Sequence, residues 1–125
     1  MMIVLYKIFM SSIFQNTILN QVKFKGVGLH SGLESEIKVI PADENYGIVF
    51  KRTDLEKNNI VKANFKNVSS ARLCTTIENE FNTNISTVEH LLAALYITGI
   101  DNALIEVNTS EVPILDGSSK EFVET

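Results

Sequence analysis

The sequence predicts an α+β fold, a two-layer sandwich in which helices cover one face of a small, mostly antiparallel sheet. Three observations lead to this prediction. Several short runs have the residue types or the alternation of strands, one segment has helical spacing of its apolar residues, and a further strand and the start of a second helix follow that segment. The chain has 125 residues, of which 45% are hydrophobic and 21% charged. It is therefore long enough for one domain with its own core.

The predicted strands are runs of alternating or β-forming residues that end near turn residues. They cover residues 21–25, 34–40, 48–52, 73–78 and 103–107. The last run (ALIEV) is short and apolar, as expected of a central strand. Polar residues at 58–59 and 81–84 indicate turns.

Residues 87–98 (TVEHLLAALYIT) have the clearest helical pattern, because their leucines recur at helical spacing. Ser86 is the expected N-cap, and Glu89 lies three residues later, as in a capping box. Gly99 stands where a helix commonly ends. A second helix is expected to begin near residue 118 or 119.

Residues 1–14 (MMIVLYKIFMSSIF) form an apolar segment that contains one lysine. A secretory signal has its charged residues first and a small-residue cleavage site after the apolar run, and this segment has neither. We therefore favour a core or edge strand, or a tail added by an upstream start codon.

Charge and cysteine content exclude several classes of protein. The formal net charge is −4 and the basic residues are not clustered, which argues against a nucleic-acid-binding protein. Cys74 is the single cysteine, so a disulfide within the chain is excluded. Cys74, His30 and His90 are the only soft zinc ligands in the sequence. They are three, and a closed structural zinc site uses four. No apolar stretch reaches the roughly 18 residues of a membrane span.

Glu89 and His90 are the first candidates for chemistry. Both lie in the first turn of the predicted helix and can border one pocket at its N-terminus. There an imidazole can ligate a metal and a carboxylate can accept a proton from metal-bound water. The alternative is structural, with Glu89 capping the helix and His90 half-buried on it. Spacing alone favours the structural alternative.

Three further segments have a structural alternative as well. Residues 26–32 (GVGLHSG) combine three glycines with His30, but a strand follows them, so they match neither a dinucleotide-binding fingerprint nor a P-loop. A glycine-rich hairpin is the alternative. Cys74 lies in a strand-like run, where a lone cysteine is usually a small buried hydrophobe. Residues 116–119 (DGSS) indicate a turn and a helix cap.

Four segments taken together resemble one enzyme family. They are GVGLHSG, KRTDL, ISTVEHLLAAL and GIDNALIEVNTSEVPILDGSS, which begin at residues 26, 51, 85 and 99. Their order and spacing are similar to those of UDP-3-O-acyl-N-acetylglucosamine deacetylase, the zinc amidase that commits bacteria to lipid A synthesis. The resemblance runs from about residue 13 to the end of the sequence.

The resemblance implies a cytoplasmic, zinc-dependent deacetylase that acts on UDP-3-O-acyl-N-acetylglucosamine and binds no nucleic acid. In this family two similar domains hold Zn²⁺ between them. By motif, Glu89 is expected to be the general base and His90 a zinc ligand. His30, Cys74 and Asp116 are expected to border the active site.

The sequence departs from the family pattern at both ends. Residues 1–11 extend beyond the usual start, and residues 12–125 correspond to the N-terminal domain, which stops within its second helix. The second domain, which carries the other zinc ligands, has no counterpart here. We expect that domain or a separate chain to supply them, and negligible deacetylase activity from the 125 residues alone. The alternatives are a non-catalytic binding module and a truncated remnant of the enzyme.

Overall fold

The computed structural model describes residues 3–6, 15–71, 74–115, 117 and 120–124. Most of the described elements are strands: nine come before the first α-helix, one short 3-10 turn lies among them at Phe65–Asn67, and a tenth strand separates the two α-helices. In chain order the strands are β1 (Ile3–Tyr6), β2 (Gln15–Ile18), β3 (Val22–Val27), β4 (Glu34–Pro41), β5 (Ile48–Arg52), β6 (Ile60–Lys62), β7 (Val68–Ser70), β8 (Thr76–Glu78), β9 (Asn84–Ser86) and β10 (Ala103–Val107). The α-helices are α1 (Glu89–Ile97) and α2 (Lys120–Glu124).

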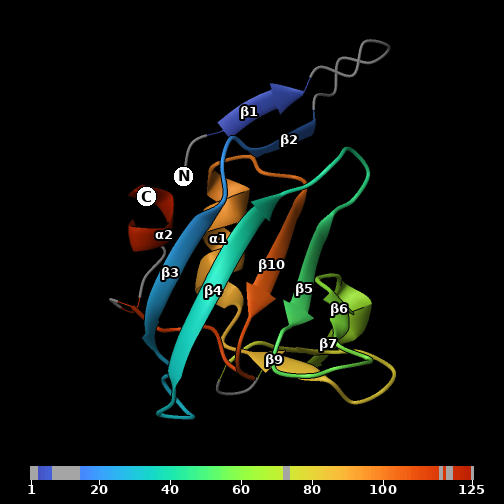
Figure 1. Ribbon diagram of the computed structural model, residues 1–125, viewed down its shortest axis with the longest axis vertical. Coiled ribbons are helices and arrows are strands. Elements are labelled where there is room, and N and C mark those ends of the chain that lie inside the picture. The colour runs from blue at the N-terminus through green and yellow to red at the C-terminus, as the bar shows by residue number, and fades with distance from the viewer. Residues whose placement is uncertain (1–2, 7–14, 72–73, 116, 118–119, 125) are drawn as a thin grey trace.

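The main sheet has five strands in the order β3-β4-β10-β5-β6. Neighbouring strands are antiparallel except β10 and β5, which are parallel. Both helices lie on the same side of this sheet, and the small sheets β1-β2 and β7-β8-β9 lie toward its opposite ends (Figure 1). The predicted α+β fold, with helices on one face of a mostly antiparallel sheet, is therefore confirmed.

The core lies between the main sheet and the helices. Ala103, Ile105 and Val107 of the central strand β10 are all 0% exposed and belong to the same apolar cluster as Leu91 and Leu95 of α1. Alternate residues of β10 are half-buried on the other face of the sheet, which gives the strand its period of two.

Helix α2 is fastened to the core by one aromatic side chain. Phe122 is 0% exposed, and its ring meets the ring of Phe24 edge to face, with centroids 4.9 Å apart. The described helix has five residues, too few to be stable in water without such packing. Its first described residue, Lys120, lies close to the predicted start at residue 118 or 119, which falls outside the described residues.

All five predicted strands have a counterpart. The predictions for residues 48–52 and 103–107 match the bounds of β5 and β10, and β3 and β4 differ from prediction by one or two residues at their ends. The strand predicted at residues 73–78 is shorter in the structure, because β8 begins only at Thr76. Residues 3–6 form β1, paired with β2, in agreement with the strand interpretation of that apolar segment.

The predicted helix start is wrong. Ser86 belongs to β9, and the N-cap position is taken by Val88, which makes no side-chain capping bond. The reason is tertiary pairing, because the Ser86 amide donates to the Ser110 carbonyl and the Val112 amide donates to the Ser86 carbonyl. Thr87 then turns the chain from strand to helix with a φ of 61°.

The predicted end of the helix is confirmed. Gly99 has a φ of 74°, in the left-handed region that glycine adopts without strain. Its amide donates to the Tyr96 carbonyl. Within the described residues, neither helix is long and apolar enough to cross a membrane.

Candidate functional site

Glu89 and His90 form the first turn of α1, directly after the turn that Thr87 makes out of β9. Both side chains are half-buried. Oε2 of Glu89 accepts a hydrogen bond of 3.1 Å from the Thr75 amide, a residue that precedes β8. The carboxylate is thus oriented by a neighbouring segment, and the predicted capping box with Ser86 is wrong.

Cys74 lies next to the residue that holds Glu89. Its side chain is half-buried, with Sγ 3.8 Å from Oγ1 of Thr76. That hydroxyl donates in turn to Oγ of Ser86, 3.1 Å away. The thiol therefore stands at the end of a row of hydroxyl groups that crosses from β8 to β9.

His30 lies in the glycine-rich loop between β3 and β4, so the hairpin expected as an alternative is present. The Gly28 amide donates to the Leu33 carbonyl, and the Gly32 amide donates to the Gly28 carbonyl. The His30 side chain is exposed. Its backbone amide points inward and donates to the Glu111 carboxylate.

Glu111 is a buried acid that lies within the family-like segment beginning at residue 99 but is not among the predicted site residues. It is 2% exposed, and its carboxylate accepts from the amides of His30 and Ser31 and from the hydroxyl of Thr87. The loop amides therefore bind an internal carboxylate. The sequence signal was slight: a single acid placed directly before the apolar segment that starts at Val112.

The hydrogen bonds decide the charge state of Glu111. Burial by itself raises the pKa of this carboxyl, because it disfavours the charged form. The bonds from Thr87, Ser31 and His30 outweigh burial, so the net effect is a pKa below the ordinary value. The acid is accordingly ionised at neutral pH.

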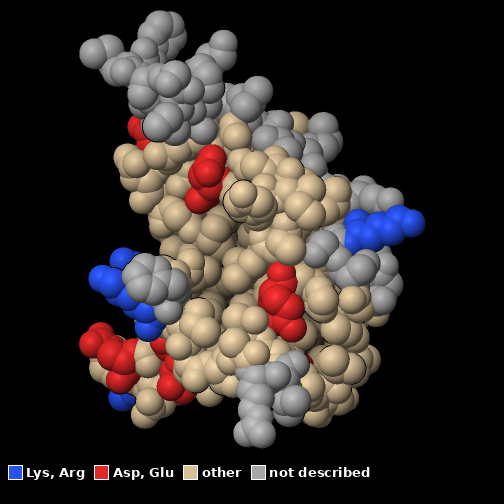
Figure 2. Space-filling model, turned by 180° about the vertical axis from the view of Figure 1, so that it is seen from behind, with Lys and Arg blue, Asp and Glu red and all other residues tan. Residues whose placement is uncertain are grey.

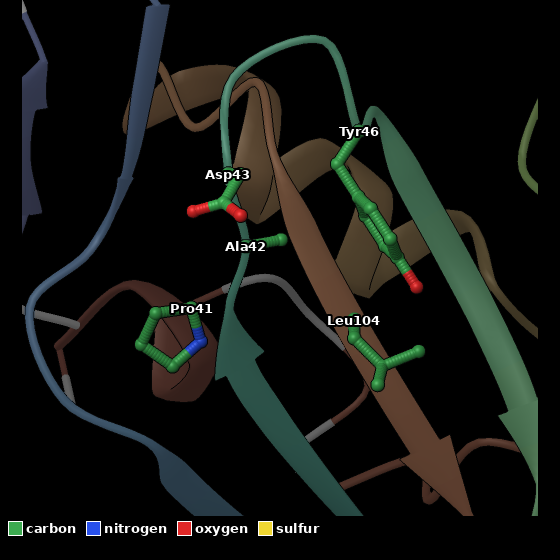
Figure 3. Close-up of a pocket in the computed structure, with 5 residues that line it drawn as sticks. All are labelled: Pro41, Ala42, Asp43, Tyr46 and Leu104. Atoms are coloured by element: carbon green, nitrogen blue, oxygen red, sulfur yellow. The ribbon is translucent and has the colours of Figure 1, made fainter.

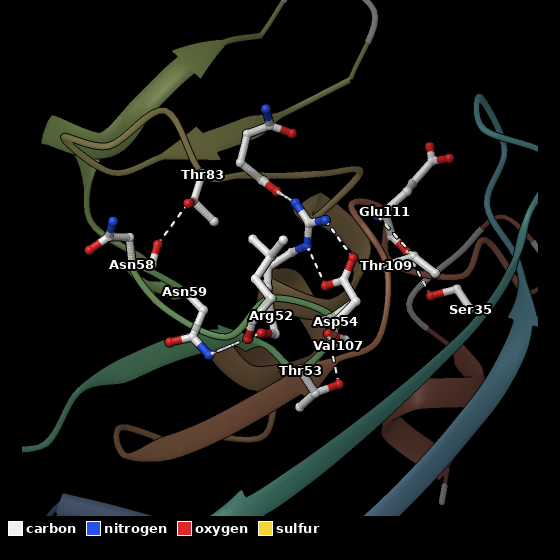
Figure 4. Close-up of polar contacts among 12 residues, drawn as sticks. Ser35, Arg52, Thr53, Asp54, Asn58, Asn59, Thr83, Val107, Thr109 and Glu111 are labelled. Atoms are coloured by element: carbon white, nitrogen blue, oxygen red, sulfur yellow. Dashed lines mark hydrogen bonds and ion pairs between the residues drawn. The ribbon is translucent and has the colours of Figure 1, made fainter.

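Arg52 ties the end of β5 to the segment before the helix (Figure 4). Its Nε and Nη2 donate to the two carboxylate oxygens of Asp54, at 2.9 and 2.6 Å. Its Nη1 donates to the Asn84 carbonyl in β9, 3.1 Å away. The bond from Arg52 lowers the pKa of Asp54. The KRTDL segment thus supports the strand that leads into Glu89.

A shallow cavity of about 280 Å³ lies away from these residues. It is lined by Pro41, Ala42, Asp43, Tyr46 and Leu104 (Figure 3). Leu104 is one of the half-buried residues of β10, on the sheet face that does not carry the helices. This cavity contains none of the predicted site residues.

The described residues contain no group of three or more His, Cys, Asp or Glu side chains that could hold a metal ion. Asp116, the remaining predicted site residue, lies outside the described residues. The structure thus brings Glu89 next to the segment of Cys74, and connects the loop of His30 to the turn before α1 through Glu111.

The outer face of α1 is apolar and exposed. Tyr96 is 88% exposed and Ile97 67% exposed, and Ala93 is exposed on the turn before them. Seen from this side, the described surface carries few charged side chains in its middle (Figure 2). An exposed apolar patch of this kind is typical of a surface that contacts another protein segment.

Comparison with known proteins identifies relatives. The model of the UDP-3-O-acyl N-acetylglycosamine deacetylase family matches residues 15–125. Proteins from Shewanella woodyi and Geotalea uraniireducens, both named UDP-3-O-acyl-N-acetylglucosamine deacetylase, are each 50% identical to this chain over 111 residues. The aligned segment covers 89% of this chain but 36% of each relative. The chain therefore spans little more than a third of their length.

Proposed function

Because this chain belongs to the UDP-3-O-acyl N-acetylglycosamine deacetylase family, we propose that it forms part of the active site of an enzyme that deacetylates UDP-3-O-acyl-N-acetylglucosamine in lipid A biosynthesis. The observation that carries the proposal is the pair Glu89–His90 at the start of α1, with the Glu89 carboxylate held by the Thr75 amide. The names of the two relatives support the same substrate.

Glu89 is the proposed general base. A general base must keep its reacting oxygen within reach of the proton that it removes. The bond from Thr75 fixes Oε2, and Oε1 has no hydrogen-bond partner among the described residues, which suits it to receive a proton. Half-burial next to the helix N-terminus limits the ways in which the carboxylate can turn.

His90 is the proposed Zn²⁺ ligand of this chain. Zinc, when bound, polarises a carbonyl and lowers the pKa of a bound water. A catalytic zinc normally takes three protein ligands, and the described residues offer no cluster of three donor side chains. These residues therefore do not make a zinc site by themselves, and the other ligands would come from a second domain or a separate chain.

The apolar face of α1 is the surface that we assign to this second part. Tyr96 and Ile97 lie on the helix that begins with Glu89 and His90, so a domain packed on them would also reach the candidate site. His30, Cys74 and Asp116 remain proposed border residues. Residues 12–125 as one domain, residues 1–11 as an extension and a cytoplasmic location likewise remain predictions.

The experiment uses the protein as it occurs in its source cell. Its intact mass is measured first, because this shows whether further chain accompanies the 125 residues. Acetate release from UDP-3-O-acyl-N-acetylglucosamine is then compared between this protein and Glu89→Gln. Removing a general base should lower kcat by about 10²- to 10⁴-fold. Glu106→Gln is the matched control, because Glu106 is half-buried on the opposite face of the sheet.

Zinc content, measured by elemental mass spectrometry, gives a readout that does not depend on activity. We expect His90→Ala to lower the zinc bound per protein and Glu106→Gln to leave it unchanged. The isolated 125-residue chain should bind zinc weakly and release negligible acetate. A tight stoichiometric zinc site on that chain would contradict this assignment.

The other outcomes separate the alternatives. If the protein releases no acetate but stays monodisperse and binds a partner, it is a non-catalytic binding module. If it releases none and aggregates through the exposed face of α1, it is a remnant of the enzyme. Full activity of Glu89→Gln would refute the role of Glu89 while leaving the family unchanged.

A further inference from the structure

Glu111 joins two segments that both belong to the candidate site. Its Oε1 accepts from the Ser31 amide at 2.7 Å and from the His30 amide at 3.0 Å. Its Oε2 lies 3.1 Å from the same His30 amide and accepts from the Thr87 hydroxyl. One carboxylate therefore connects the glycine loop of His30 with the turn that leads into Glu89 and His90.

The contacts of Glu111 are those of a fixed anchor. A buried charge is costly unless its oxygens are satisfied, and here three donors satisfy them, with no cationic partner among the described residues. Its own carbonyl accepts from the hydroxyls of Ser35, at 2.6 Å, and Thr109, at 3.0 Å. The backbone that carries the carboxylate is thus held from β4 and from the segment after β10 (Figure 4).

Thr87 is the residue on which this anchor acts. Its φ of 61° is unfavourable for a β-branched side chain and persists only where the surroundings impose it. Its side chain is 2% exposed, and its hydroxyl donates to Glu111. Because Thr87 lies two residues before Glu89, its backbone angles set the direction in which α1 starts.

The glycine loop is shaped around the same carboxylate. A Cβ atom at Gly28 would overlap Oε1 of Glu111 and Oγ of Ser31, so glycine alone allows this approach. The contact holds the loop backbone at His30 close to the turn that leads into α1. The exposed side chain of His30 belongs to this loop.

We propose that Glu111 is a positioning residue, which holds the His30 loop and the Thr87 turn in one arrangement and so fixes where Glu89 and His90 stand. This inference rests on the proposed function, in which those two residues take part in catalysis. The alternative is that Glu111 only stabilises the fold. The two hypotheses make different predictions for a variant that lacks the hydrogen bond between Thr87 and Glu111 but keeps the fold. Only the positioning hypothesis predicts that Glu89 and His90 move.

The test compares threonine substitutions in the protein as isolated from its source. Thr87→Val keeps the shape and removes the hydroxyl, whereas Thr87→Ser keeps the hydroxyl. Thr17→Val is the matched control, since Thr17 is 1% exposed and its hydroxyl donates to the Asn102 carbonyl in another part of the fold. Each variant is assayed for kcat and KM, for unfolding, and for the NMR signals of Glu89, His90 and the His30 amide.

We expect Thr87→Val to lower kcat by roughly 10- to 100-fold with little change in KM, because misplacement of a catalytic group by about 1 Å has effects of that size. Thr87→Ser should restore kcat, and Thr17→Val should leave it within about twofold even where it destabilises the fold as much. Glu111→Gln should also lower kcat and speed hydrogen exchange of the His30 and Ser31 amides.

Equal effects of Thr87→Val and Thr17→Val on kcat would overturn the proposal and leave Glu111 a structural residue. If the unmodified protein releases no acetate, the proposed function fails, and the NMR signals alone decide. Shifts of the Glu89 and His90 signals in Thr87→Val that Thr87→Ser reverses and Thr17→Val lacks would then support positioning. Unchanged signals would refute it.

Discussion

Replacing Phe122 with alanine should destabilise the protein strongly, because this fully buried side chain packs a short helix on the core. Phe122 is 0% exposed and meets Phe24 at a centroid distance of 4.9 Å and an interplanar angle of 67°. A buried phenylalanine removes roughly 200 Å² from water. At about 25 cal/mol per Å² this burial contributes about 5 kcal/mol. Because alanine keeps part of the area, we expect Phe122→Ala to lower the free energy of unfolding by about 3–5 kcal/mol.

Urea denaturation followed by circular dichroism measures this loss. Phe81→Ala is the matched control, because Phe81 is 56% exposed and loses the same atoms. It should cost less than about 1 kcal/mol, as exposed positions commonly do. Phe122→Ala should lower the denaturation midpoint with little change in the slope. If it costs no more than Phe81→Ala, α2 is not held on the sheet by this ring and the reasoning is refuted.

Three more predictions concern the polar contacts. The folded pKa of Glu111 lies below the ordinary value of 4.5, so its bonds stabilise the protein above that pH and lose their effect as pH falls through the folded pKa. The stability difference between the protein and Glu111→Gln should therefore shrink in acid denaturation series, and a difference independent of pH would contradict this. Gly28→Ala should lower the free energy of unfolding by about 1–3 kcal/mol through overlap with Glu111, measured by urea denaturation. Arg52→Lys, which lacks the planar pair of donors that binds the two oxygens of Asp54, should cost about 1 kcal/mol and raise the Asp54 pKa in an NMR titration.

The central strand β10 could be predicted because its residue types alternate with the burial of its two faces. Residues of β10 alternate between the helix-covered face and the outer face, and both sides of β10 are occupied by other strands. The buried positions Ala103, Ile105 and Val107 are therefore apolar, and this alternation is visible in the sequence. Short strands such as β6, β7 and β9 have three residues each, too few for any period to show.

The helix start shows where local rules fail. Ser86 and Glu89 satisfy a capping box by spacing, and the start was predicted there. In the structure Ser86 pairs with the segment of Ser110 and Val112, more than twenty residues away in sequence, and this pairing removes it from the capping position. Glu111 escaped prediction for the same reason, because its partners His30 and Thr87 are far from it in sequence.

The loss of the capping box changes the balance between the two interpretations of Glu89. The structural alternative held that this carboxylate is present because it caps its own helix, a task that glutamine performs equally well. In the structure the carboxylate binds the Thr75 amide and leaves the N-cap, Val88, without a side-chain partner. Capping therefore does not account for Glu89. A half-buried carboxylate fixed through one oxygen beside His90 suits the proposed general base, so the substitution that separates the interpretations is Glu89→Gln. It should preserve the free energy of unfolding within about 0.5 kcal/mol while lowering kcat for acetate release by about 10²- to 10⁴-fold.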